Sequence, residues 1–249
     1  MKPAVAPPSS IFLLLVSTLA AAGQSYGKED QDAWSFQVKP VLWNPAISLR
    51  FSDSDDDDDD ENSQPDYCFF CFDKLSNYLA LQAEARRSRY AVLFDGLRVR
   101  FEDTLTDGRV NLNIASTLGF VELAAAYQHR EDIPLDAYVG VRYTFVENEI
   151  WFARLPAVEE DYDWVDPVIG ARYTYTINRD WSMLLRGDIG GFGVSTDWMT
   201  NASVDAVFRV NDLVSLSAGY RYLDIKFEDD DFLYDANLKG LQVAAAFSF

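Results

Sequence analysis

The stretch Leu241-Gln242-Val243-Ala244-Ala245-Ala246-Phe247-Ser248-Phe249 decides the predicted fold. Its odd-numbered residues are Leu, Val, Ala, Phe and Phe, whereas its even-numbered residues are Gln, Ala, Ala and Ser. Successive side chains of a β-strand point to opposite faces, so this stretch has one apolar face and one small, polar face. The pattern predicts a barrel strand whose apolar face contacts lipid, whose other face lines the lumen, and whose terminal aromatic sits at the membrane interface.

The same alternation divides residues 34–249 into ten expected strands separated by turn signals. In the clearest of them, Leu135, Val139 and Val141 oppose Asp136 and Arg142. The ten segments are 34–42, 77–87, 90–101, 110–128, 135–145, 165–177, 181–192, 198–210, 213–227 and 241–249. We therefore predict an all-β fold, an antiparallel transmembrane β-barrel of about 10 strands (about 8 to 12). The alternative is a soluble β-sandwich, which also alternates but buries its apolar faces against each other.

Connections of two kinds alternate along these segments. The short turns are 87–89, 129–134, 178–180 and 211–212, and the other connections, mostly longer and more acidic, are 43–76, 102–109, 152–164, 193–197 and 228–235. Short turns of bacterial barrels face the periplasm and long loops face outward. We therefore expect both ends of the barrel on the periplasmic side and the acidic connections outside.

The alternation is interrupted in segment 110–128. Its apolar residues are even-numbered up to Ile114 and odd-numbered from Val121. An extra residue in one strand shifts the following side chains to the other face. The interruption therefore predicts a β-bulge, or the end of a strand, near Gly119.

Two further segments break the pattern. Asp95 and Arg98 fall on opposite faces of segment 90–101, so one of these charges is expected to face lipid. In segment 213–227 the apolar face switches after Tyr222. We expect the switched part to project beyond the bilayer.

The N-terminal residues have the features of a secretory signal. Lys2 precedes the apolar run 11–22, and the small residues at its end suit cleavage after Ala22. The run is shorter than the roughly 20 apolar residues of a membrane-spanning helix. We expect a signal peptide at 1–22, a short N-terminal segment at 23–33, and an outer-membrane barrel at 34–249 with an acidic outer loop at 52–66.

Composition agrees with a barrel and excludes one class of partner. Hydrophobic residues make up 49% of the chain, yet its mean hydropathy is only −0.13, so apolar and polar residues are interleaved. The formal charge of −19, from 21 Lys and Arg against 40 Asp and Glu, leaves no basic patch for nucleic acid. We therefore expect no nucleic-acid partner.

The acidic run 53–61 is the only candidate metal site in the sequence. Asp53, Asp55 and Asp57 are weak candidates for Ca²⁺ or Mg²⁺ ligands, because the run has neither the glycine nor the spacing of an EF-hand loop. Such runs are usually solvated and self-repelling. We therefore expect no metal centre and no cofactor, and the run sharing divalent cations with lipopolysaccharide phosphates stays a hypothesis.

The two cysteines and the single histidine carry little chemistry. Cys68 and Cys71 have CxxC spacing but lack nearby zinc ligands, so we expect a local disulfide or inert thiols. His129 lies in a predicted turn, with no nucleophile and orienting acid recognisable around it. We therefore expect a protein that is not an enzyme.

Three segments share the pattern apolar-Gly-apolar-Arg-Tyr, at 139–143, 169–173 and 218–222. With the signal sequence and Phe249, this pattern resembles the small outer-membrane β-barrels of the OmpA transmembrane-domain, OmpX and opacity-protein type. The resemblance implies the outer membrane of a Gram-negative bacterium, with outer-membrane lipid, lipopolysaccharide and the barrel assembly machinery as partners. It also implies that Phe247 and Phe249 form the assembly signal.

Charged residues on the inward faces are the candidate site. A glycine on an inward face leaves space for an arginine from a neighbouring strand, and a buried arginine must be paired. The expected lumen charge network comprises Lys39, Glu84, Glu122, Arg142, Arg172, Arg186, Asp188, Asp205, Arg209 and Arg221, with Asp166 as a further inward acid. We expect these residues to fill the lumen with salt bridges, in a protein with a structural or surface-interaction role; the alternative is a narrow diffusion channel for small solutes.

Overall fold

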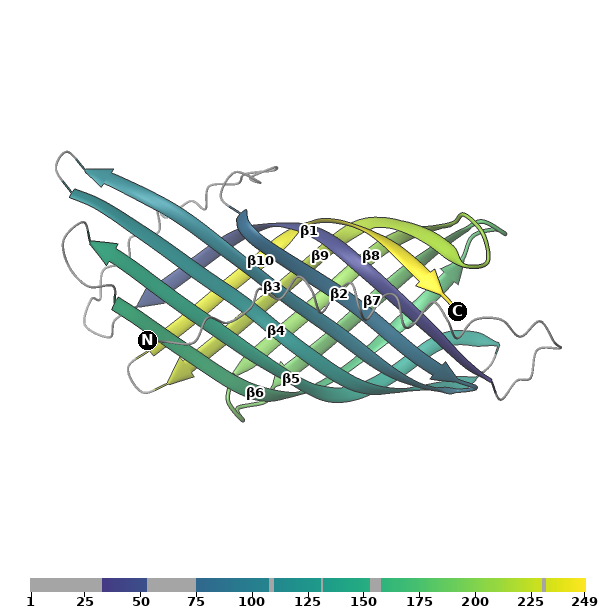
Figure 1. Cartoon of the computed structure of the whole chain (residues 1–249). Helices are drawn as coiled ribbons and strands as arrows, with labels where there is room; N and C mark the ends of the chain where they lie inside the picture. Colours follow the sequence, from purple (N-terminus) through teal and green to yellow (C-terminus); the bar gives the residue numbers. More distant parts are fainter. Residues whose placement is uncertain (1–32, 53–74, 108–109, 131, 153–157, 230–231) are drawn as a thin grey trace, which may run out of the picture.

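The computed structural model describes residues 33–52, 75–107, 110–130, 132–152, 158–229 and 232–249, which form one closed antiparallel β-barrel (Figure 1). The strands are β1 (Trp34–Ser52), β2 (Leu75–Arg87), β3 (Tyr90–Asp107), β4 (Val110–Arg130), β5 (Ile133–Phe152), β6 (Val158–Thr176), β7 (Trp181–Gly191), β8 (Trp198–Arg209), β9 (Val214–Asp229) and β10 (Phe232–Ser248). The predicted ten-stranded barrel is confirmed. Because β1 pairs with β10, the sheet has closed on itself and the alternative of a β-sandwich is excluded.

Several expected features lie outside the described residues. These are the signal peptide at 1–22, nearly all of the segment 23–33, the acidic loop 52–66 except Ser52, the weak metal candidates Asp53, Asp55 and Asp57, and the cysteines Cys68 and Cys71. No helix capable of spanning a membrane occurs in the described part of the chain.

The two ends of the barrel differ in their connections. At one end, which we call the turn end, neighbouring strands are joined at 88–89, 131–132, 177–180 and 210–213, close to the predicted short turns. Both termini of the barrel lie there, where Phe36 N–H donates to Phe249 O (2.8 Å) and Phe249 N–H donates to Phe36 O (2.9 Å). We call the opposite end the loop end.

The strands are longer at the loop end than the sequence suggested. β4 has 21 residues and β5 has 20, whereas roughly 9–11 residues cross a bilayer. The predicted connections 102–109, 152–164 and 228–235 are wrong in extent, because strand pairing continues through most of each, for example at Asp107↔Val110 and Ile150↔Val158. In Figure 1 the β3–β4 and β5–β6 hairpins reach furthest at this end.

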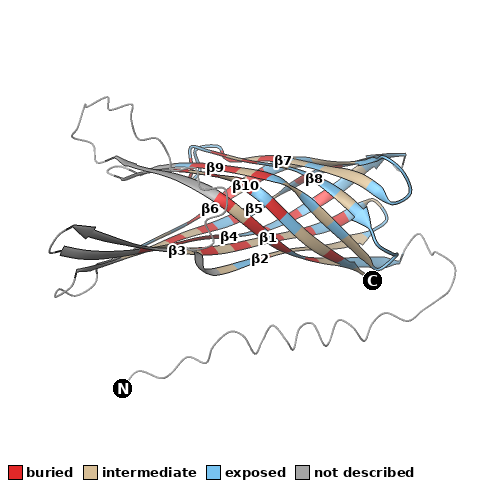
Figure 2. Cartoon of the chain, turned by 90° about the horizontal axis from the view of Figure 1, so that it is seen from above, coloured by how far each residue is buried: buried red, intermediate tan, exposed pale blue. Residues whose placement is uncertain are grey.

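An apolar belt surrounds the half of the barrel next to the turn end, where buried and exposed residues alternate along the strands (Figure 2). Leu123, Val139 and Val243 face outward on β4, β5 and β10 and are 50–61% exposed. Aromatic pairs such as Trp181–Phe208 (ring centroids 5.0 Å) flank the belt on the turn side. An apolar outer face bordered by aromatic side chains is typical of a barrel wall in lipid.

Toward the loop end the polarity of the two faces is exchanged. Beyond Leu241 the outward residues of β10 are Lys239 and Asn237, while Leu238 points inward and is fully buried. On β9 the inward residues Leu223 and Ile225 are likewise fully buried. The pleat continues without interruption, so the switch after Tyr222 is a change in the chemistry of the two faces and not in the strand; that this part projects beyond the bilayer stays a prediction.

The same exchange explains segment 110–128, for which the predicted bulge or strand end near Gly119 is wrong. β4 pairs with β3 and β5 in unbroken register through this position, and the only irregularity on the β5 side lies between Gln128 and Arg130. Phe120 and Glu122 both point inward, the first into apolar surroundings and the second into polar ones. The apolar residues change face because the surroundings of the two faces change along the strand; the strand itself has no bulge there.

The seam between β1 and β2 is the shortest ladder in the barrel. Among the described residues it pairs Trp34↔Arg87 through Pro40↔Leu81, whereas β1 pairs with β10 along nearly its whole length. Past Pro40 the Trp43 backbone N–H donates to the Tyr78 hydroxyl (2.7 Å) rather than to a backbone carbonyl of β2. A side chain therefore replaces the ladder at the point where it ends.

Candidate functional site: the charged barrel interior

The centre of the barrel holds a buried cluster of charged side chains built around Arg142 of β5. Its guanidinium donates to both Glu122 of β4 and Asp188 of β7, with 2.7 Å to Asp188. All three residues are at most 4% exposed. A buried arginine is tolerated when it is paired and hydrogen-bonded in this way.

Two more arginines complete this cluster. Arg186 of β7 contacts Asp95 (3.0 Å) and Glu122 (2.6 Å), and Arg221 of β9 contacts the same Asp95 (3.0 Å). Arg221 also donates to the side-chain oxygen of Asn201 (3.0 Å). We call the six charged residues Asp95, Glu122, Arg142, Arg186, Asp188 and Arg221 the central ion cluster; three guanidiniums and three carboxylates make it formally neutral.

Neutral polar side chains add further hydrogen bonds to this cluster. The Tyr138 hydroxyl donates to Asp188 (2.8 Å) and accepts a hydrogen bond from Arg186 (3.0 Å). Asn201 also donates to Asp188 (2.7 Å). Complete hydrogen bonding matters because each unpaired polar group in a low-dielectric interior is costly.

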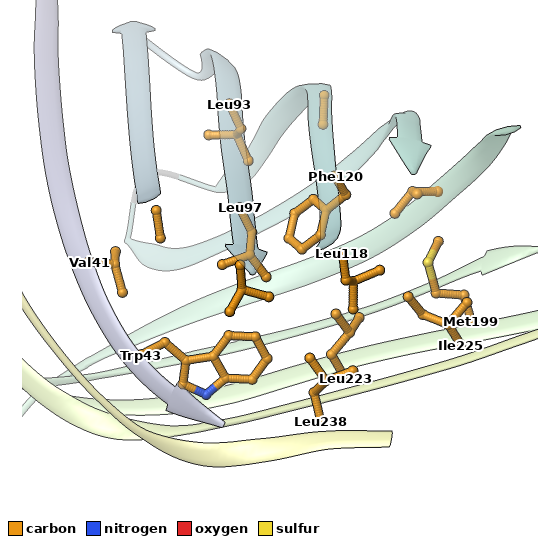
Figure 3. Close-up of a cluster of buried hydrophobic side chains, with 14 of the residues drawn as sticks. Val41, Trp43, Leu93, Leu97, Leu118, Phe120, Met199, Leu223, Ile225 and Leu238 are labelled. Atoms are coloured by element: carbon orange, nitrogen blue, oxygen red, sulfur yellow. The ribbon is translucent and has the colours of Figure 1, made fainter. Parts of the chain in front are cut away.

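Toward the loop end, an apolar core lies next to the central ion cluster (Figure 3). Its side chains point toward one another from β1, β3, β4, β8, β9 and β10; they include Trp43, Leu97, Leu118, Phe120, Met199, Leu223, Ile225 and Leu238. Each is at most 3% exposed. This core is a layer that the sequence analysis did not anticipate, since it expected polar residues throughout the lumen.

Cation–π contacts join the two layers. The guanidinium of Arg142 lies 5.0 Å from the centroid of the Phe120 ring, and that of Arg221 lies 5.4 Å from the same ring. Arg221 also lies 5.3 Å from the ring of Trp43. An aromatic face attracts a desolvated cation, so these rings can border charged groups without a water layer between them.

A second charged group, which we call the rim cluster, lies nearer the turn end. Arg86 contacts Glu84 (2.7 Å) and Asp136 (2.6 Å), while Arg172 contacts the same two acids at 2.7 and 2.8 Å. The four side chains are 10–23% exposed, so water screens them more than it screens the central ion cluster. Two bases and two acids again balance in charge.

The inward glycines of the repeated pattern make room for side chains other than arginine. A Cβ at Gly170 would clash with the Tyr138 ring and lie 2.7 Å from Asp188 Cβ. A Cβ at Gly219 would clash with the Asp205 carboxylate. The expectation that these glycines accommodate a neighbouring arginine is therefore wrong for Gly170 and Gly219.

A cavity of about 420 Å³ occupies the interior on the turn-end side of the central ion cluster, and the rim cluster lines it. A second cavity of about 320 Å³ continues to the turn end, where Asn178, Arg179 and Asp212 line it. The two cavities share lining residues, among them Gln37 and Ser215. We call the pair the vestibule.

The remaining predicted network residues lie apart from both clusters. Lys39 is buried and lines the vestibule, while Asp205 is buried and accepts a hydrogen bond from Gln242 (2.7 Å). Arg209 is exposed at the mouth of the vestibule. Asp166 accepts hydrogen bonds from the backbone N–H of Thr196 (3.0 Å) and from its hydroxyl, and so fixes the β7–β8 connection.

Sequence reasoning missed several members of the clusters. Asp95 was left between two faces, and the structure places it inside, whereas Arg98 faces outward near Glu147 (3.5 Å), beyond the apolar belt. Arg86 and Asp136 fell on inward faces of their segments and could have been included on that ground alone. Tyr138 and other neutral members carry no charge signal that would have marked them. Among the described residues, no three His, Cys, Asp or Glu side chains are placed to hold a metal ion.

The closed antiparallel barrel, with its apolar outer belt and its charged interior, has the architecture of a transmembrane β-barrel protein. No protein-family model and no curated protein matches its sequence.

Solved structures similar to the chain include Ail, the attachment invasion locus protein of Yersinia pestis, at 8% identity and a TM-score of 0.42, covering 88% of this chain and 99% of Ail. The transport unit of the autotransporter AIDA-I from Escherichia coli matches at 8% identity and a TM-score of 0.43, covering 97% and 98% of the two chains. Neisserial surface protein A matches at 12% identity and a TM-score of 0.32, covering 87% and 97%.

Proposed function

We propose that this protein is an outer-membrane barrel with a plugged lumen and a structural or surface-interaction role. The observation that carries the proposal is the stacking of two buried layers of side chains, the central ion cluster and the apolar core, across the barrel interior. Arg142, Phe120 and Leu223 are each fully buried in these layers. An interior filled with side chains is usual near 8 strands, whereas wide aqueous channels occur near 16.

Conductance in a planar bilayer tests the plug. We expect the refolded barrel to insert without steady single-channel steps, because no ion can pass two layers of buried side chains without displacing them. A 16-stranded porin inserted in the same bilayer is the positive control. Steady steps from the present protein, of uniform size, would refute the proposal.

A narrow diffusion channel is the second candidate, and the vestibule is the observation that favours it. Its two cavities run from the turn end to the level of Arg186. In the part of the chain that the structure describes, the central ion cluster and the apolar core separate this space from the loop end. If the barrel conducts, replacing Phe120 with Ala should enlarge the steps. If it is plugged, the same variant should open leaks where the parent protein has none.

The role at the surface concerns lipid and the assembly of the barrel. We propose that the apolar belt contacts outer-membrane lipid, that the acidic loop 52–66 faces outward near lipopolysaccharide, and that Phe247 and Phe249 are read by the barrel assembly machinery. Both aromatic rings are about 40% exposed on the outer face of the last strand. Replacing both with Ala should slow assembly in cells while leaving refolding in detergent intact; equal slowing of both processes would contradict an assembly signal.

The proposal includes no catalytic activity. His129, the only histidine in the sequence, is exposed at the end of β4, and its ring packs against Tyr127 with centroids 6.4 Å apart. A general base would need a nucleophile within hydrogen-bond reach and a group to orient it. Hydrolysis of ester or peptide substrates that is lost in His129→Ala would overturn this part of the proposal.

A further inference from the structure

Lys39 of β1 is the exception among the charges that line the larger cavity of the vestibule. Its side chain is 9% exposed and lies against the larger cavity. Among the described residues it makes no ion pair and no hydrogen bond. Asp205 and Asp95 interact with it electrostatically from a greater distance, but Asp95 is already held by Arg186 and Arg221.

The other charges that line the larger cavity are balanced. Glu84 and Asp136 are paired with Arg86 and Arg172 in the rim cluster, and Arg186 belongs to the neutral central ion cluster. Lys39 therefore gives this cavity a positive charge without a contact partner. The buried Asp205, which accepts a hydrogen bond from the neutral Gln242, is the acid that acts on it most strongly, from a greater distance. A buried charge without a partner is costly, which makes this position a natural site for an anion.

The walls around Lys39 indicate what else the anion carries. Gln37, Gln82, Ser215 and Ser217 line the same cavity and supply amide and hydroxyl groups, which donate and accept hydrogen bonds. A volume of about 420 Å³ lies within the range of small-molecule sites. The second cavity connects this space to the turn end, so a solute can enter from there.

From this geometry we infer that the vestibule binds a small hydroxylated carboxylate, with its carboxylate group at Lys39 and its hydroxyl groups on the amide and hydroxyl walls. One positive charge without a contact partner matches a monoanion. A dianion would add a net negative charge beside Glu84 and Asp205. The site goes beyond the proposed function, because binding at the turn end requires neither a closed nor an open lumen.

Calorimetric titration of the refolded barrel in nonionic detergent tests the site, with gluconate as the probe. We expect gluconate to bind, and glucose, which has similar hydroxyl groups but no charge, to give no measurable binding. Lys39→Met should weaken gluconate binding by about tenfold or more, since it removes the charge-assisted partner. Lys226→Met, at an exposed lysine on the outer face of β9, is the matched control and should bind like the parent protein.

Migration on a gel before and after boiling establishes that each variant is folded. If Lys39→Met does not fold, amide chemical shifts of the parent protein decide: gluconate should perturb Ser215 and Ser217 and leave the outward Leu216 unchanged. No gluconate binding, equal binding of glucose, equal affinity in folded Lys39→Met, or shifts spread over the outer face would each overturn the inference. Conductance is measured separately in a bilayer, so failure here and failure of the plug are distinguishable.

Discussion

The halves of the barrel at the turn end and at the loop end use the same strands in opposite ways. Near the turn end, the apolar Val139 faces outward while Glu84 and Arg172 face the interior. Near the loop end, Lys239 faces outward while Leu238 is buried inside. The turn-end half is organised for a bilayer and the loop-end half for water, with an apolar core like that of a soluble protein. The comparison teaches that a continuous strand can serve two solvents by exchanging the chemistry of its faces.

The largest expected effect is the loss of Arg142 at the boundary between the halves. Arg142→Met leaves Glu122 and Asp188 buried with one counter-charge fewer, which should destabilise the barrel by about 3–5 kcal/mol. Urea unfolding in lipid vesicles, followed by gel mobility, measures this change.

Two controls sharpen that prediction. Arg130→Met removes an exposed turn arginine paired with Asp132 (2.7 Å) and should change stability by less than about 0.5 kcal/mol. The double variant Arg142→Met/Glu122→Met should be less destabilised than Arg142→Met alone, because an apolar pair replaces an unbalanced charge. A loss below about 1 kcal/mol in Arg142→Met would contradict an essential ion cluster.

The apolar core should behave like the core of a soluble protein. Leu223→Ala empties a fully buried position and should cost about 2–5 kcal/mol. Leu241→Ala, at a position that is 47% exposed on the belt, should cost less because lipid fills the space left by the side chain. Equal losses at the two positions, measured by the same unfolding experiment, would show that the halves do not differ in this way.

A charge placed on the outer face should distinguish the halves directly. Val139→Arg introduces a cation into the belt and should cost about 2–4 kcal/mol if it lies near the bilayer midplane. Lys226→Leu, at an outward position past the belt, should change stability by no more than about 0.5 kcal/mol. A gain of several kcal/mol from Lys226→Leu would place that position inside the lipid and move the boundary toward the loop end.

The smallest effect is expected for the outer pair Arg98–Glu147. The two charges are 3.5 Å apart and each side chain is 41% exposed, so water screens their attraction. A double-mutant cycle with Ala should give a coupling of about 0–1 kcal/mol. A coupling as large as that of the buried pair Arg142–Glu122 would mean that this part of the outer face is not in water.

The turn-end half was predictable from the sequence because apolar residues there mostly face outward and polar residues face inward. Segment 135–145 assigned Asp136 and Arg142 inward, and both lie inside. Alternation gives the face of each residue but not its height in the membrane, so Phe120 and Glu122, on the same inward face, looked like a bulge. The position of a residue along the barrel axis depends on the stagger between neighbouring strands. The sequence of one strand does not reveal this stagger.

The partners within the clusters were not predictable for a related reason. Arg142 of β5 contacts Asp188 of β7, a strand that is not its direct neighbour, across the curved wall. Such pairs depend on the closure and stagger of the whole barrel. Neutral members such as Asn201 belong to the site only through their hydrogen bonds. An uncharged residue on an inward face looks the same in the sequence whether or not it contacts the cluster.

The short ladder between β1 and β2 has a consequence for how the wall yields. Each lost backbone pair lowers the resistance of a seam to local opening, and Trp43 has only the hydroxyl of Tyr78 where a carbonyl would otherwise accept its N–H. Proteins open first where cooperative backbone bonding is thinnest. In deuterated buffer, the amide of Trp43 should therefore exchange before that of Gln242, its partner on the continuously paired strand β10. We expect the barrel wall to open first along the boundary between β1 and β2.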